Sequence, residues 1–173
     1  MIITFSGTHG AGKTTTAKAL AKRLGYTYYS VGDVMRQIAT ERGITIKELA
    51  DQLQNEPELD KEIDSRTKLL ATQDNLVVDA RMGWFFLPKS LKVFITAPLN
   101  KRAARSFADP RKSDGFVDVN QAAEQLEGRQ EQLTKNLSSL YGVNPYDPKN
   151  FDLIVDTSEK SVDEVVETIV SAL

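Results

Sequence analysis

The residues best suited to chemistry lie near the start of the 173-residue chain. Residues 7–14 (GTHGAGKT) match the pattern G-x-x-x-x-G-K-[ST] at every fixed position. The glycines let the backbone curl so that successive N–H groups face inward and bind an anion. Lys13 would reach the β- and γ-phosphates of a nucleotide, and the Thr14 hydroxyl would bind Mg²⁺. The residues expected to surround the nucleotide are Gly7, Gly10, Ala11, Gly12, Lys13, Thr14 and Thr15. We call residues 7–14 the phosphate loop, and ATP and Mg²⁺ are the expected cofactors.

Two other residues bear on this loop. Asp79 ends an apolar run, which is the usual place for an acid near the Mg²⁺ of a nucleotide site. The alternative is a carboxylate that only pairs with Lys13 or Arg81. His9, at a variable position of the motif, is interpreted as a solvated loop residue and not as a general base, because phosphoryl transfer relies mainly on positioning and charge neutralisation.

The hydrophobic pattern indicates the elements that must position these groups. Short apolar runs predict strands at 2–6, 26–30, 75–80, 91–97 and 151–157. Helical patterns lie between them, and several of the runs are apolar throughout, as in parallel strands covered on both faces. The alternation predicts one α/β domain over residues 1–173, with three layers and a five-stranded parallel sheet. Three helical stretches follow one another without a strand between them: about 32–42, a segment starting near Thr45, and about 58–73.

Composition excludes several classes of protein. The chain has no cysteine and one histidine, which excludes disulfides, thiolate catalysis and zinc sites built from Cys or several His. The 22 basic and 24 acidic residues give no overall positive field, so a nucleic-acid polymer is not the expected partner. No apolar run is long enough to cross a membrane, and the first residues do not form a signal peptide. We therefore expect a cytoplasmic protein of monomer size that acts on small molecules.

Charge is nevertheless concentrated locally. Residues 101–112 hold five cations and one acid, and the loop after them contains Pro, Ser and Gly and so can move. A small GTPase is not indicated, because Asn100-Lys101-Arg102-Ala103 lacks the aspartate that would read guanine. The chain also has little room for the extra domains of motors or transporters. The helices between the second and third strands form an insertion where small kinases place the phosphate acceptor.

Several segments resemble cytidylate kinases, especially the short archaeal type. Residues 29–36 (YSVGDVMR) are similar to the S-x-G-D-x-x-R segment of that family. Further similarity lies in 57–66, in 77–81 (VVDAR), in 141–144 (YGVN) and in 151–157. The resemblance covers nearly the whole chain, and its most specific part is 55–81. It implies a P-loop kinase fold with an acceptor-binding insertion at about 32–73 and a lid at about 106–128.

The resemblance also implies roles for individual residues. Arg36 and Arg81 would hold the acceptor phosphate, and the lid arginines would reach the transferred phosphoryl group. The acceptor side would contain Ser30, Asp33, Arg36, Asp60, Asp64, Arg66 and Arg81. The catalytic cations would be Lys13, Arg102, Arg105 and Arg129, and the metal ligands would be Thr14 and Asp79.

Some of these residues have other interpretations. Asp60 and Asp64 are four apart on one helix face, where they could bind a base amine, orient Arg66, or form a solvated acidic face paired with lysines. The alternative for the lid arginines is a solvated helix face. Of the aromatic residues at 84–86, one could stack on a base, although burial in a short helix is the more common outcome.

The sequence departs from the family pattern at the lid and beside the acceptor. Asn136 stands where a second lid arginine is expected, and Ala80-Arg81-Met82 lacks the aspartate that follows Gly-Arg in bacterial cytidylate kinases. The expected reaction is transfer of the γ-phosphate of ATP to CMP or dCMP. The alternatives are another small acceptor (UMP, AMP, or one like shikimate or gluconate) or a regulatory or assembly ATPase.

Overall fold

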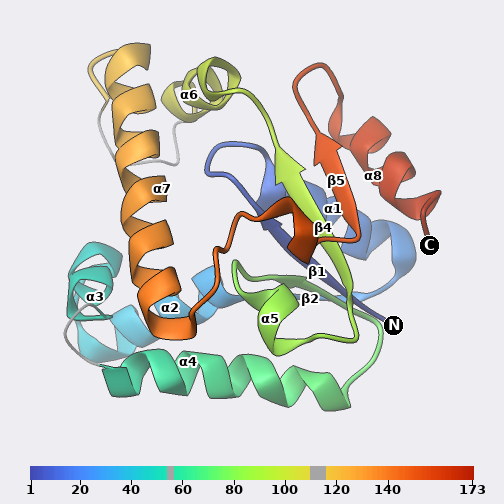
Figure 1. Cartoon of the computed structure of the whole chain (residues 1–173), viewed down its shortest axis with the longest axis horizontal. Helices are drawn as coiled ribbons and strands as arrows, with labels where there is room; N and C mark the ends of the chain where they lie inside the picture. The colour runs from blue at the N-terminus through green and yellow to red at the C-terminus, as the bar shows by residue number, and fades with distance from the viewer. Residues whose placement is uncertain (54–56, 110–115) are drawn as a thin grey trace.

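A computed structural model describes residues 1–53, 57–109 and 116–173 (Figure 1). Its centre is a parallel sheet of five strands in the order β2-β3-β1-β4-β5. The strands are β1 (Ile2–Gly7), β2 (Thr27–Ser30), β3 (Leu76–Asp79), β4 (Leu91–Thr96) and β5 (Leu153–Asp156). The helices are α1 (Lys13–Leu24), α2 (Val31–Arg42), α3 (Ile46–Leu53), α4 (Pro57–Leu69), α5 (Gly83–Phe86), α6 (Leu99–Phe107), α7 (Val119–Tyr141) and α8 (Val162–Val170). The predicted α/β class and five-stranded parallel sheet are confirmed.

The register of the sheet brings the candidate site residues to one edge. Phe5 of β1 pairs with Asp79 of β3, and Ser30 of β2 pairs with the same Asp79. The chain enters the phosphate loop directly after these positions. The carboxyl ends of three neighbouring strands therefore meet at one place, which is where open α/β sheets bind ligands.

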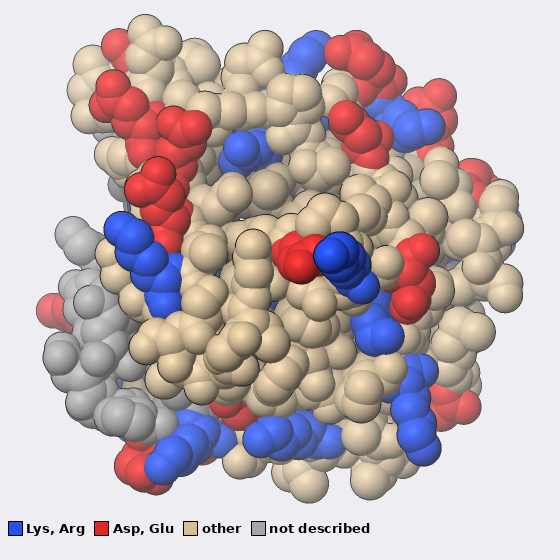
Figure 2. Space-filling model, viewed as in Figure 1, with Lys and Arg blue, Asp and Glu red and all other residues tan. Residues whose placement is uncertain are grey.

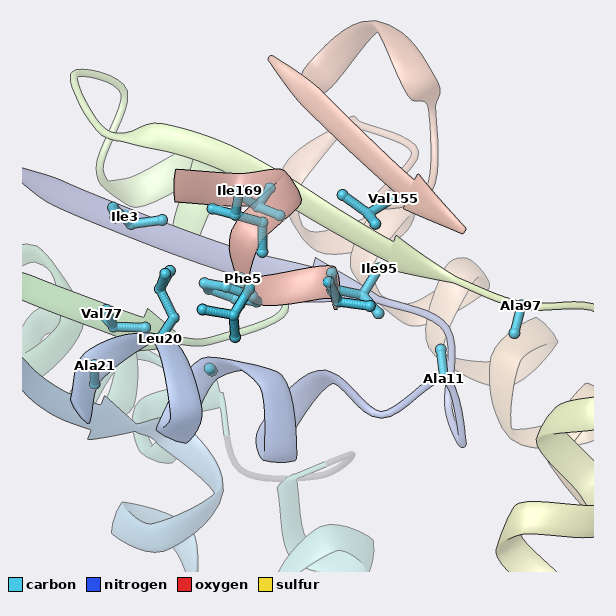
Figure 3. Packing of buried hydrophobic residues seen from close by; sticks show 14 residues of the cluster. Ile3, Phe5, Ala11, Leu20, Ala21, Val77, Ile95, Ala97, Val155 and Ile169 are labelled. Carbon is cyan, nitrogen blue, oxygen red and sulfur yellow. The ribbon is translucent and has the colours of Figure 1, made fainter. Parts of the chain in front are cut away.

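One face of the sheet forms the main core (Figure 3). Residues of one parity, such as Ile3 and Phe5, point to this face because side chains alternate along a strand. Leu20 of α1 and Ile169 of α8 pack against them and are fully buried. This packing fixes α1, and with it the end of the phosphate loop, against the sheet.

The opposite face carries a smaller core. Leu76 and Val78 of β3 pack there with Leu70 and Leu87, which come from the segments just after α4 and α5. Trp84 of α5 is buried at 8% exposure, which confirms the burial of an aromatic in a short helix.

Two further units have hydrophobic clusters of their own. The insertion of α2, α3 and α4 packs around Ile38, Leu49 and Ile63. Helices α6 and α7 pack around Ala103 and Leu126. In Figure 1, α7 runs from beside α6 to the insertion, where its last residue, Tyr141, contacts Asp64 of α4.

The boundaries differ modestly from the expected ones. The helix predicted at 58–73 ends at Leu69 and continues as a short 3-10 turn, Leu70–Thr72. The last strand covers Leu153–Asp156, shorter than the predicted 151–157. Part of the predicted lid, 110–115, lies outside the described residues. Within the described part of the chain, no helix combines the length and the apolar character needed to span a bilayer.

Candidate active site

The phosphate loop is shaped by its glycines and by its contact with α6. Gly10 has a φ of +81°, and a Cβ there would lie 2.8 Å from the Arg102 carbonyl oxygen. Gly7 is tighter, because a Cβ would meet the Ile95 carbonyl oxygen at 2.2 Å. Helix α1 starts at Lys13 with Gly12 as its N-cap, and no side chain caps it. Its first N–H groups therefore lack a side-chain acceptor, which suits a phosphate bound at the helix start.

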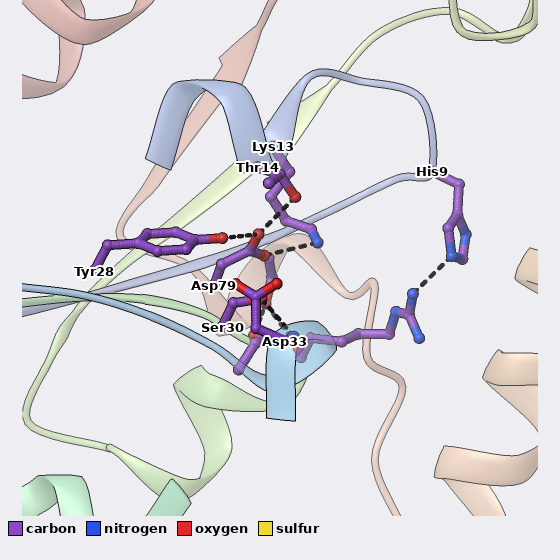
Figure 4. Close-up of polar contacts among 10 residues, drawn as sticks. His9, Lys13, Thr14, Tyr28, Ser30, Asp33 and Asp79 are labelled. Atoms are coloured by element: carbon purple, nitrogen blue, oxygen red, sulfur yellow. Dashed lines mark hydrogen bonds and ion pairs between the residues drawn. The ribbon is translucent and has the colours of Figure 1, made fainter. Parts of the chain in front are cut away.

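Asp79 is the centre of a hydrogen-bond network beside this loop (Figure 4). Lys13 Nζ donates to Asp79 Oδ1 at 2.9 Å, and Thr14 Oγ1 donates to Oδ2 at 2.7 Å. The Tyr28 hydroxyl, from β2, donates to the same Oδ2 at 3.1 Å. Pairing of Asp79 with Lys13 is thus present, whereas Arg81 is not among the partners of Asp79 within the described residues.

Electrostatics keep this carboxylate ionised. Burial alone would raise the pKa of Asp79, but the Lys13 ammonium and the hydrogen bonds from Thr14, Lys13 and Tyr28 outweigh it and lower that pKa. Burial also raises the pKa of Tyr28 to about 12, and the nearby Asp79 charge adds to the rise. Tyr28 therefore stays a neutral hydrogen-bond donor at neutral pH.

These donors suit a magnesium ion. Mg²⁺ prefers oxygen ligands and commonly uses one or two protein oxygens together with substrate phosphates. The Thr14 hydroxyl and the Asp79 carboxylate supply such oxygens at the foot of the phosphate loop. The arrangement fits the predicted Mg²⁺ ligands, which stay a prediction.

Arg81 follows β3 and lies beside the phosphate loop. Its Nη2 donates to His9 Nε2 at 2.7 Å, and its carbonyl oxygen accepts from the Ser6 hydroxyl at 2.7 Å. Its Nε is buried without a hydrogen-bond partner, and no carboxylate of the described residues forms an ion pair with it. The interpretation of His9 as a solvated loop residue is wrong, because its ring is partly buried and contacts Arg81.

Other residues that the resemblance assigns to the acceptor are held by local contacts. The Ser30 hydroxyl caps α2 by accepting from the Asp33 N–H, and the Asp33 carboxylate pairs with the exposed Arg36. Arg66 is oriented by Glu62 at 2.5 Å. These partners are carboxylates or a helix end, so a bound acceptor would have to compete with them.

Asp64 has a different partner from those expected. Its carboxylate is half-buried and accepts a hydrogen bond from the Tyr141 hydroxyl at the end of α7. Burial raises the pKa of Asp64, although the Tyr141 hydrogen bond and Lys68 act in the opposite direction. The contact ties the insertion of α2, α3 and α4 to α7. The partner of Arg66 is Glu62, so the expectation that Asp64 orients Arg66 is not met. The side chain of Asp60 lies outside the described part of the structure.

Both α6 arginines are held by hydrogen bonds to protein oxygens. Arg102 is 8% exposed, and its guanidinium donates to the Ala97 carbonyl at 2.9 Å and to the His9 carbonyl at 3.3 Å. Arg105 donates to the Thr157 hydroxyl at 2.9 Å and to the Thr157 carbonyl at 2.6 Å. The solvated-face interpretation is therefore wrong for Arg102, and neither arginine points freely into solution.

Two hollows flank these arginines. One of about 300 Å³ lies beside Ala11, Gly12, Arg105 and Thr157, between the phosphate loop and the start of α8. The other, of about 330 Å³, lies between α6 and α7 and is lined by Arg102 and by residues of α7. Acidic side chains gather along α7 over this second hollow (Figure 2).

The lid prediction is only partly described. Arg129 is exposed on α7, and Asn136 accepts a hydrogen bond from Gln132. Arg111 and Lys112 fall outside the described residues. The roles predicted for Arg102, Arg105 and Arg129 in phosphoryl transfer stay predictions.

Sequence reasoning did not identify Tyr28, Tyr141 or Thr157 as site residues. Tyr28 lies two residues before Ser30 on the same strand, so alternation places both side chains on one face. That periodicity was the available signal. Nothing local in the sequence connects Tyr141 with Asp64 or Thr157 with Arg105.

The chain resembles known proteins in both sequence and fold. The model of the cytidylate kinase-like family matches residues 2–159. The chain is 34% identical to the cytidylate kinase of Pyrococcus abyssi, over all of this chain and 93% of that protein. It is 35% identical to the cytidylate kinase of Ignicoccus hospitalis, over 97% of this chain and 96% of that one. A shikimate kinase structure from Bacteroides thetaiotaomicron superposes with a TM-score of 0.71 at 16% identity, over 99% of this chain and 97% of that one.

Proposed function

The chain belongs to the cytidylate kinase-like family, and from this membership and the geometry of its phosphate loop we propose that it transfers the γ-phosphoryl group of ATP to CMP or dCMP. The relatives named cytidylate kinase match it over nearly their whole length. The shikimate kinase likeness supports the shared fold and says nothing about the acceptor.

The observation that carries the proposal is the state of Arg81. Its guanidinium lies beside the phosphate loop, has a buried Nε with no partner, and is not neutralised by any described carboxylate. A buried donor without a partner is unfavourable, so the site favours an anion that fills it. A guanidinium fork matches two phosphate oxygens. We place the phosphate of the acceptor there, with ATP on the phosphate loop next to it.

The reaction needs little covalent chemistry from the protein. The attacking oxygen belongs to a phosphate that is already anionic, so no general base is needed. Lys13 holds the β- and γ-phosphates, and the N–H groups at the start of α1 donate hydrogen bonds to the phosphate oxygens. Thr14 and Asp79 would hold Mg²⁺, which would supply further positive charge to stabilise the phosphates. Arg81 holds the acceptor in line, which is the positioning on which phosphoryl transfer mainly depends.

The hollow beside Arg105 is where we place the nucleoside of ATP. It is continuous with Ala11 and Gly12 of the phosphate loop and has Val162 and Val165 on its apolar side. Arg105 and Thr157 give it a polar rim. We further propose that the protein acts as a monomer in the cytoplasm on nucleotide substrates.

An acceptor screen tests the function. ADP release would be followed with CMP, dCMP, UMP, AMP, shikimate and gluconate, each with MgATP. The proposal predicts the highest kcat/KM with CMP or dCMP, and a loss of at least about a hundredfold in Lys13→Ala, which removes one charge from the transferred phosphates. A higher kcat/KM with shikimate or gluconate would show that the acceptor is not a nucleotide. ADP release that no acceptor increases would favour a regulatory ATPase and overturn the kinase assignment.

A further inference from the structure

The contact between His9 and Arg81 joins the phosphate loop to the segment that follows β3. His9 belongs to the phosphate loop (Figure 4), and its ring accepts a hydrogen bond from Arg81, which follows β3. We propose that His9 is a positioning residue that holds the Arg81 guanidinium toward the acceptor phosphate. The assignment of Arg81 to the acceptor phosphate rests on the proposed function, whereas its contact with His9 is observed in the structure.

The direction of this hydrogen bond determines the state of the imidazole. A guanidinium has only donors, so the 2.7 Å contact requires His9 Nε2 to accept from Arg81 Nη2. The ring must therefore be neutral, with its proton on Nδ1. A protonated imidazole would place an N–H against a cation.

A neutral acceptor has an advantage over a carboxylate at this position. Arg36 and Arg66 are each held by an acid, which neutralises the charge that a phosphate would use. His9 orients Arg81 through one of its five N–H donors and leaves its full charge in place. The other donors stay available for the oxygens of an anion.

Both partners are anchored through their backbones. The His9 carbonyl accepts from Arg102 Nη1 at 3.3 Å, and the adjoining Gly10 packs against α6. The Arg81 carbonyl accepts from Ser6 at 2.7 Å. The His9 ring thus projects from a fixed loop, and the guanidinium it holds lies at a defined place relative to the donor phosphates. Since small misplacements slow transfer steeply, the contact would affect acceptor use.

Kinetics of matched variants test the role. His9→Ala removes the acceptor atom, whereas His9→Gln retains an oxygen that can accept from Arg81. We expect His9→Ala to raise KM for CMP about tenfold, the loss of one charge-assisted hydrogen bond, with KM for MgATP changed less than about twofold. His9→Gln should recover most of the loss. In an Arg81→Ala background, His9→Ala should have little further effect, because interacting residues are not additive.

A spectroscopic measurement tests the contact without relying on catalysis. The chain has one histidine, so ¹⁵N spectra of its imidazole contain a single ring system. We expect the Nδ1–H form at neutral pH, and a change in tautomer or titration in Arg81→Ala. An unchanged imidazole in Arg81→Ala, an unchanged KM for CMP in His9→Ala, or an equal rise in both KM values would overturn the proposal. A wild-type protein that does not phosphorylate CMP would instead overturn the proposed function, while the ¹⁵N result would still decide whether His9 holds Arg81.

Discussion

Replacement of Asp79 by Asn should weaken the fold and the nucleotide site together. The side chain keeps its size but loses its charge, and an amide has one acceptor oxygen in place of two. Lys13, Thr14 and Tyr28 all donate to the native carboxylate, so at least one of them loses its acceptor.

The size of the effect follows from burial. Removing one partner of a fully buried ion pair destabilises a protein by about 3–5 kcal/mol. Here the Asp79 side chain is 4% exposed but that of Lys13 is 20% exposed, so water can partly replace the lost partner. We expect Asp79→Asn to lower the free energy of unfolding by about 2–3 kcal/mol near neutral pH, within the range for hydrogen bonds to a charged group.

Urea unfolding at several pH values provides the assay. The folded-state pKa of Asp79 lies below the ordinary 3.8, so its stabilising charge is fully present above that value. Its contribution is lost as the pH falls through the folded pKa, because the folded carboxylate must then bind a proton. The difference between wild type and variant should therefore be constant from neutral pH to about pH 5 and shrink below pH 3.8.

An exposed acid serves as the control. Asp163 lies in the first turn of α8 and is exposed, so Asp163→Asn should change stability by less than about 1 kcal/mol through the helix dipole. The reasoning is refuted if Asp79→Asn matches this control, or if its effect does not change at acidic pH.

Three further predictions concern the loop, the insertion and the ATP side. Gly7→Ala should lower the melting temperature more than Gly12→Ala, because its Cβ would meet the backbone of β4 at 2.2 Å whereas the Cβ of Gly12 meets nothing within 4 Å; equal shifts would contradict this. Tyr141→Phe should raise the pKa of Asp64 further, because burial already raises that pKa and the Tyr141 hydrogen bond opposes the rise. Carboxyl ¹³C titration would measure it, and an unchanged or lower pKa would contradict the prediction. Arg105→Ala should raise KM for MgATP about tenfold by removing one charged contact and leave KM for CMP nearly unchanged, and steady-state kinetics that give the reverse would place Arg105 on the acceptor side.

The sheet and its order of elements were predictable because their signals are local. Apolar runs specify strands, and the phosphate loop between a strand and a helix fixes the position of Lys13 and Thr14. The proximity of Asp79 to this loop follows from parallel pairing, in which strand ends meet at one edge.

The contacts between units were not predictable from local patterns. His9 and Arg81 are 72 residues apart, and Tyr141 and Asp64 are 77 apart. Whether His9 is solvated depends on how closely β3 brings Arg81 to the phosphate loop. The hydrophobic periodicity of the sequence does not predict that distance. The burial of Arg102 likewise depends on the packing of α6 against the phosphate loop. The many cations in its segment suggest an exposed helix instead.

The products of a single incubation test the central claim most directly. Purified protein, CMP and MgATP would be separated by anion-exchange chromatography over time. We expect CDP and ADP to form in a ratio of one to one, and Lys13→Ala to form at most about a hundredth as much of each. ADP formed without CDP would contradict it, because the γ-phosphoryl group would then be passing to water and not to the acceptor.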